Sequence, residues 1–148
     1  MPDSDSTLLF TYPCPGIRRR EMKRFALELQ HRVSGGRAFC CIIAEDWDLR
    51  RLNRKFRGTN TATDVLSFPS GMRAGFLGDI AISIQRAAAQ AAERRHAVDA
   101  EVRILMLHGV LHLIGLDHER DGGQMARAET KWRKAMGLPA GLIERVRT

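Results

Sequence analysis

The chain has 148 residues, of which 44% are hydrophobic and 28% are charged, and its formal net charge is +7. This length predicts one domain with its own core, and this composition excludes a disordered chain, a collagen-like repeat and a disulfide scaffold. Apolar stretches stay short of the roughly 18 residues of a membrane span, and the first ten residues carry no Lys or Arg. We therefore expect a cytoplasmic protein without a membrane partner, loosely ordered at 1–6 and 140–148.

Hydrophobic periodicity predicts a mixture of strands and helices. A continuous apolar run at 38–44 is typical of a strand that is covered on both faces. The expected elements are, in chain order, strand 7–12, helix 18–33, strand 38–44, helix 46–56, strand 64–68, strand 76–84, and helices 85–97, 99–115 and 124–136. Because these elements do not alternate strictly, we expect an α+β fold, a small mixed sheet of about four strands with helices packed over it.

The positive charge lies in one early segment. Residues 17–57 hold twelve basic and five acidic residues, whereas the rest of the chain holds twelve of each, so this segment accounts for the whole net charge. Twenty of the 24 basic residues are Arg, whose guanidinium binds phosphate through two hydrogen bonds. Such an excess is typical of a protein that binds an anionic partner, nucleic acid first, although a solvated helix face accounts for the charge equally well.

The three cysteines, Cys14, Cys40 and Cys41, fit a reducing compartment. Cys40 and Cys41 are neighbours in a predicted strand, so their side chains point to opposite faces and do not readily bind one metal ion. We interpret all three as small buried hydrophobic residues.

The sharpest chemical signal is segment 108–118, which reads H-G-V-L-H-L-I-G-L-D-H. His108 and His112 are four residues apart and therefore lie on one face of a helix. Gly115 lets the chain leave the helix, and the turn brings His118 back toward the pair. Three imidazoles leave the fourth position of a tetrahedral zinc open, as in catalytic sites, and such an ion lowers the pKa of its bound water toward about 7. We predict a zinc ion held by these three histidines.

The same spacing occurs in the metzincin signature H-E-x-x-H-x-x-G-x-x-H, with one departure. Gly109 stands where the protease has its general-base Glu, and glycine cannot move a proton, so we expect a zinc hydrolase that is not a peptidase. Asp117 fits two roles: it accepts a hydrogen bond from a ligand imidazole, or it binds its own backbone in a turn. His31 and His96 lie in polar helical surroundings and are interpreted as surface residues.

The motif H-G-x-L-H-L-x-G-x-D-H resembles the signature of the YbeY family of bacterial endoribonucleases, the rRNA maturation factors. Residues 52–58, followed by 63–69, are similar to the family's L-N-x-x-[YF]-R-G and T-D-V-L-S-F-P stretches, and 77–80 is similar to its L-G-D-I strand. The similarity runs from about residue 40 to residue 136. Ala62 stands where the family has Pro, a change that loosens a loop and removes no chemical group.

The resemblance implies a single α+β domain over 1–148, with one zinc ion bound on a helix and the turn that follows it. It implies metal-dependent cleavage of single-stranded RNA, maturation of the 16S rRNA precursor at its 3′ end, and ribosome quality control with the small ribosomal subunit. Position by position, the zinc ligands fall on His108, His112 and His118. The family's functionally important arginine falls on Arg57.

These roles agree with the chemistry of RNA cleavage, in which a zinc ion and an Arg can neutralise the negatively charged transition state. Arg57 closes a basic segment that we expect to bind RNA and that also contains Arg50, Arg51, Arg54 and Lys55. Attack by the zinc-bound water and attack by the RNA 2′-hydroxyl both fit. Ser67 and Asp64 are candidates for lining the site, and strand packing or turn capping explains them nearly as well.

Two other functions fit parts of the sequence. The first is a non-catalytic RNA-binding ribosome-assembly factor with a structural metal site. The open three-ligand site favours the enzyme, because structural zinc usually has four protein ligands, and Asp117 or a Cys as a fourth ligand would favour the factor. The second is a zinc hydrolase for a small molecule or peptide, which would require a deep, closed apolar pocket without a basic groove.

Overall fold

The computed structural model describes residues 5–11, 13–61, 63–71, 75–116 and 122–139. The elements are β1 (Thr7–Phe10), α1 (Arg19–Arg32), β2 (Ala38–Ala44), α2 (Asp46–Arg57), β3 (Val65–Pro69), β4 (Phe76–Ser83), α3 (Ile84–Arg94), α4 (Val98–Leu113) and α5 (Gln124–Ala135). Every strand and helix that the periodicity predicts is present, and the predicted α+β fold is confirmed. No helix within the described ranges is long and apolar enough to cross a membrane.

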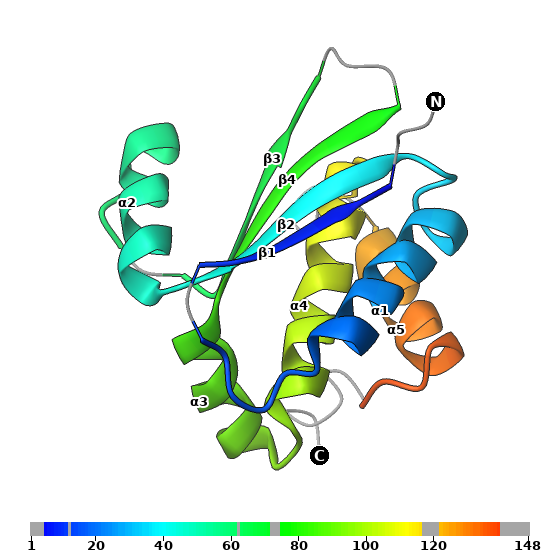
Figure 1. Cartoon of the computed structure of the whole chain (residues 1–148). Helices are drawn as coiled ribbons and strands as arrows, with labels where there is room; N and C mark the ends of the chain where they lie inside the picture. Colours follow the sequence, from blue (N-terminus) through cyan, green and yellow to red (C-terminus); the bar gives the residue numbers. More distant parts are fainter. Residues whose placement is uncertain (1–4, 12, 62, 72–74, 117–121, 140–148) are drawn as a thin grey trace.

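The strands form one mixed sheet in the order β1-β2-β4-β3 (Figure 1). β2 is parallel to β1 and β4, whereas β3 is antiparallel to β4 and lies at the edge of the sheet. Gly78 explains the L-G-D-I stretch: its φ is +146°, and a Cβ there would lie 2.2 Å from the carbonyl oxygen of Phe68. Only glycine lets β4 approach β3 this closely.

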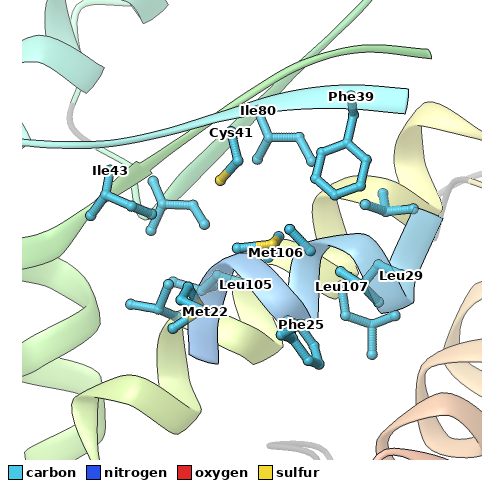
Figure 2. Packing of buried hydrophobic residues seen from close by; sticks show 14 of the residues in the cluster. Met22, Phe25, Leu29, Phe39, Cys41, Ile43, Ile80, Leu105, Met106 and Leu107 are labelled. Carbon is cyan, nitrogen blue, oxygen red and sulfur yellow. The ribbon is translucent and has the colours of Figure 1, made fainter. Parts of the chain in front are cut away.

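One face of the sheet carries the main core. Figure 2 shows sheet side chains pointing toward α1 and α4, and α4 also contacts α3, α5 and β3. A helix that is enclosed in this way is apolar on nearly every side, which explains its dense hydrophobic sequence. The labelled core residues are Met22, Phe25, Leu29, Phe39, Cys41, Ile43, Ile80, Leu105, Met106 and Leu107.

α2 packs on the opposite face, where a small second core joins Leu49 to Ala44, Leu66 and Ala81. The basic segment 17–57 is therefore continuous in sequence but divided in space, since α1 and α2 lie on different faces (Figure 1).

The adjacent cysteines of β2 mark the same division, as the alternation of the strand predicts. Cys41 is buried in the main core, whereas Cys40 is half-buried on the α2 face. Cys14 is buried in the main core too, and all three are free thiols.

The expectation of loose order at 1–6 is wrong at Ser6, which is 1% exposed. Its backbone N–H and its hydroxyl both donate to Gln30 Oε1, at 2.8 and 2.9 Å, and its Oγ accepts from the Phe39 N–H at 3.0 Å. These bonds fix the start of β1 between α1 and β2. Residues 1–4 and 140–148 lie outside the described residues.

Candidate metal centre

The predicted histidine pair lies near the C-terminal end of α4. His108 and His112 are one turn apart, and their Nε2 atoms face each other at 3.0 Å. The two rings meet edge to face, with centroids 4.6 Å apart. Both side chains are half-buried, so the pair combines a position fixed by the helix with access from solvent.

A carboxylate from α5 holds the first of these rings. His108 Nδ1 is hydrogen-bonded to Glu129 Oε1, and the other carboxylate oxygen of Glu129 accepts from Arg133 Nη2 at 3.3 Å. Burial lowers the pKa of Arg133, and the neighbouring carboxylates of Glu129 and Glu101 oppose that shift. When Nδ1–H donates to a carboxylate, the Nε2 lone pair points at the shared space in front of His112.

This arrangement fits a zinc ion. Two Zn–N bonds of about 2.0–2.1 Å at a tetrahedral angle place the nitrogens ~3.3 Å apart, close to the spacing of the pair. The carboxylate behind His108 is the partner that metal-binding imidazoles usually have. Among the residues that the structure describes, no three His, Cys, Asp or Glu side chains form a cluster for a metal. The predicted third ligand, His118, and the predicted accessory residue, Asp117, lie outside the described residues.

Gly109 lies between the histidines in sequence but faces the sheet. A Cβ there would be 2.9 Å from Ile80 Cγ2, so a side chain at this position would force Ile80 to shift. The position that carries the general base in metzincins therefore faces β4 here.

Ser67 of β3 adjoins the same turn of α4, because its Oγ donates to the Gly109 carbonyl at 3.3 Å. Asp64 does not join it: its Oδ2 accepts from Gln90 Nε2 of α3 at 3.1 Å. Of these two candidates, only Ser67 is in contact with the helix turn that carries the histidine pair.

A buried charge cluster lies at the other end of α4. Glu101 is fully buried and accepts from Arg94 Nη1 at 2.6 Å, and His96 Nε2 lies 2.5 Å from its second oxygen. His96 is only 10% exposed, so its interpretation as a surface residue is wrong. Arg95 adopts a left-handed backbone, with φ of 61°, and turns the chain so that His96 reaches Glu101.

The predicted RNA-binding segment lies on α2. Two of its cations have partners, since Arg50 Nε donates to Asn60 Oδ1 at 3.3 Å and Arg51 lies 3.7 Å from Asp48. Arg54, Lys55 and Arg57 are exposed and form no ion pair with any carboxylate in the described part of the chain. The sequence predicts the cations, but not how many of them stay available.

α2 and the histidine pair share β3 as a neighbour. The Phe68 ring packs against the Phe56 ring of α2, with centroids 5.3 Å apart, whereas Ser67 bonds to α4 on the other face. Arg57, next to Phe56, therefore lies on the opposite face of the sheet from the α4 turn, beside the edge strand that both elements contact.

A family model described as Endoribonuclease YbeY matches residues 19–137. A curated Endoribonuclease YbeY from Solibacter usitatus is 53% identical over 143 residues, covering 97% of this chain and 96% of that protein. The chain belongs to the YbeY family. A second family member, from Koribacter versatilis, is 52% identical over 104 residues, covering 70% of this chain and 68% of its own length. The solution structure of TM1509 from Thermotoga maritima is similar in fold, with a TM-score of 0.63, 25% identity and coverage of 88% of this chain and 89% of that one.

The YbeY match includes all five helices and therefore α5, which sequence reasoning left without a role. Glu129 is the residue that this reasoning missed. It lies 21 positions after His108, and nothing in the local pattern of α5 distinguishes it from a surface carboxylate.

Proposed function

We propose that this protein is a zinc-dependent endoribonuclease that cuts single-stranded RNA. The observation that carries the proposal is the convergence of His108 and His112 Nε2, with the Glu129 carboxylate behind His108. The curated relatives are named as endoribonucleases, which supports RNA as the substrate.

The residues divide into two groups of roles. His108, His112 and His118 would hold the zinc, and when bound this ion acidifies a coordinated water and polarises a phosphoryl oxygen. Glu129 keeps the Nδ1 proton on His108 and directs its Nε2 toward the metal position. Gly109 offers no general base, and water and the substrate's own 2′-hydroxyl are the two candidate nucleophiles.

Arg57 would contact a phosphate of the bound RNA strand from the α2 face, beside the edge strand that α2 and α4 both contact. It is exposed and forms no ion pair within the described ranges, so its guanidinium is available for a bidentate bond to phosphate. Arg50, Arg51, Arg54 and Lys55 would guide the RNA backbone along α2 toward the edge of the sheet.

We propose the 3′ end of the 16S rRNA precursor as the substrate, within the quality control of the small ribosomal subunit. This assignment rests on the family resemblance of the motifs. An exposed basic helix suits an RNA-rich particle, whose phosphates attract cations over long range.

The direct test measures metal content and RNA cleavage in the same preparations of wild type, His112→Ala and His31→Ala. We expect about one zinc per chain and cleavage of single-stranded RNA in wild type. His112→Ala should lose both, whereas His31→Ala, which changes an exposed histidine of α1, should keep both.

Cleavage that persists in His112→Ala would contradict the proposal. Zinc in the wild type without any cleavage would instead favour a non-catalytic RNA-binding assembly factor with a structural metal. The small-molecule hydrolase has less support, because the apolar hollow lined by Leu52 and Phe56 lies beside the basic helix and not beside the histidines.

A further inference from the structure

A groove opens between α2 and the sheet face that α2 leaves uncovered. Its volume is about 550 Å³, and its lining includes Ile42, Leu52, Phe56, Phe68, Asp79 and Ala81; we call it the α2 groove. The histidine pair is not part of it, since α4 lies on the other face of the sheet.

The α2 groove presents an aromatic wall to solvent. Phe56 is 59% exposed although a large apolar side chain is normally buried, and its ring packs against Phe68 at a 60° tilt. The Lys55 ammonium lies 5.3 Å from the centre of the Phe56 ring. An exposed aromatic face beside a cation is the combination on which proteins stack the bases of single-stranded nucleic acids.

The positive charge beside the groove favours a polyanion as its ligand. Arg54, Lys55 and Arg57 surround Phe56 in sequence on the last turns of α2, and none forms an ion pair with a described carboxylate. A protein partner of ordinary composition would have to supply a separate acidic side chain for each of these three charges or bury the charge unpaired. A nucleic acid strand supplies phosphates at regular spacing that can neutralise all three.

Asp79 is the one acidic residue that lines the groove, and it indicates which chemical group of the ligand the groove recognises. Its carboxylate is exposed among apolar neighbours, and in the described part of the chain it has no hydrogen bond or ion pair. A carboxylate repels phosphate but accepts hydrogen bonds from the amino groups of bases, as Asp and Glu do with cytosine N4. Cytosine, adenine and guanine carry such an amino group, and uracil does not.

We infer that the α2 groove binds a nucleobase of single-stranded RNA, which stacks on Phe56 and is selected by Asp79 for an exocyclic amino group. The neighbouring phosphates bind Arg54, Lys55 and Arg57. The inference rests on the proposed function for its class of ligand. Phe68 and Ser67 are adjacent in β3, the edge strand. An RNA strand held in the groove therefore needs only to cross this sheet edge to reach the α4 turn.

The test is equilibrium binding of labelled oligocytidine and oligouridine with 2′-O-methyl sugars, measured by fluorescence anisotropy with the metal-loaded protein. Phe56→Leu keeps the apolar bulk but removes the ring, Phe56→Tyr keeps the ring, and Trp47→Leu is the matched control. Trp47 is also on α2 and is 65% exposed, but it does not line the groove. Circular dichroism of each variant checks that it is folded.

We expect Phe56→Leu to weaken oligocytidine binding by about 5- to 100-fold, and Phe56→Tyr and Trp47→Leu to bind as wild type. The salt dependence should stay unchanged in Phe56→Leu, whereas Lys55→Gln should reduce the slope by about 0.7 for its one lost phosphate contact. Wild type should prefer oligocytidine to oligouridine by about fivefold or more, and Asp79→Ala should abolish that preference.

Wild-type affinity in a folded Phe56→Leu, or an equal loss in Trp47→Leu, would overturn the inference and assign the groove to another ligand, such as a protein. A base preference that survives Asp79→Ala would overturn the role of the carboxylate. Cleavage of ordinary RNA in the same preparations separates this inference from the proposed function. Binding that depends on Phe56 without any cleavage contradicts only the nuclease, and cleavage with binding that ignores Phe56 contradicts only the groove.

Discussion

The two faces of the sheet differ in what they bury. On the α4 face, α1, α4 and the sheet enclose a dense core, and the charged residues near it are paired, as in the contacts of Glu101 and Glu129. On the α2 face, one amphipathic helix covers part of the sheet and leaves Phe56, Trp47 and Leu9 exposed. The histidine face is therefore rigid, as a metal site requires. The α2 face is accessible, as a long flexible ligand requires.

The two faces should differ most in how much stability the protein loses when an ion pair is removed. Glu101→Ala leaves Arg94 and His96 without their buried carboxylate, and we expect a loss of about 3–5 kcal/mol in the free energy of unfolding. Arg51→Ala on α2 removes a 3.7 Å pair with a 60% exposed cation, which water already screens, so the loss should stay below about 0.5 kcal/mol. Urea denaturation measures both, and similar losses would contradict the division between the faces.

Glu129→Gln tests whether the contact between Glu129 and His108 strengthens zinc binding. Gln keeps the shape and an acceptor for His108 but removes the charge, so we expect zinc affinity to fall about 10- to 100-fold in a folded protein. Competition with a chromophoric chelator measures this affinity. Thr130→Ala, the exposed neighbour on α5, is the control and should bind zinc as wild type. An unchanged affinity in Glu129→Gln would show that its bond to His108 has no role in metal binding.

Gly109→Ala tests the close packing of α4 on the sheet. The new Cβ would be forced within 2.9 Å of Ile80 Cγ2. Overpacking of about 1–3 kcal/mol should outweigh the gain of about 1 kcal/mol that Ala brings to a helix. Gly122→Ala is the control, because no atom of the described residues would lie within 4 Å of its Cβ. A thermal midpoint in Gly109→Ala at or above that of wild type would mean that the core has room there.

The smallest expected effect is a difference in thiol reactivity between the adjacent Cys40 and Cys41. Burial raises the pKa of Cys41 far above its usual range, and burial with the nearby Asp79 carboxylate raises the pKa of Cys40 less. Because the thiolate is the reactive form, Cys40 should react slowly with iodoacetamide in the native protein and faster as the pH rises. Cys41 should react only after unfolding. Peptide mapping by mass spectrometry measures each site, and equal labelling of the two would contradict the opposite exposure of the two faces.

Local patterns were sufficient to predict the elements and the histidine pair. The four-residue spacing of His108 and His112 places them on one helix face wherever that helix packs, and the apolar run at 38–44 forms the predicted strand that is covered on both faces. Helix periodicity also predicts that the basic residues of α2 are exposed, because a helix with one apolar face leaves its other residues in contact with solvent.

Relations between distant elements were not predictable from local patterns. Glu129 meets His108 because α5 crosses α4, and the order of residues in α5 carries no sign of that crossing. α2 and α4 pack on opposite faces of the sheet, and strand periodicity does not reveal which face each helix covers. His96 was misinterpreted for the same reason, since its partner Glu101 lies beyond a turn that polar neighbours alone do not predict.

The most direct test of the account compares Arg57→Ala and His112→Ala in one assay of zinc content and single-strand RNA cleavage. The account predicts that His112→Ala loses both zinc and cleavage. Arg57→Ala should keep about one zinc and lose cleavage, because it acts on the substrate from the opposite face of the sheet. Cleavage at the wild-type rate in a folded Arg57→Ala, or in a zinc-free His112→Ala, would contradict the central claim that the two faces act together on one RNA strand.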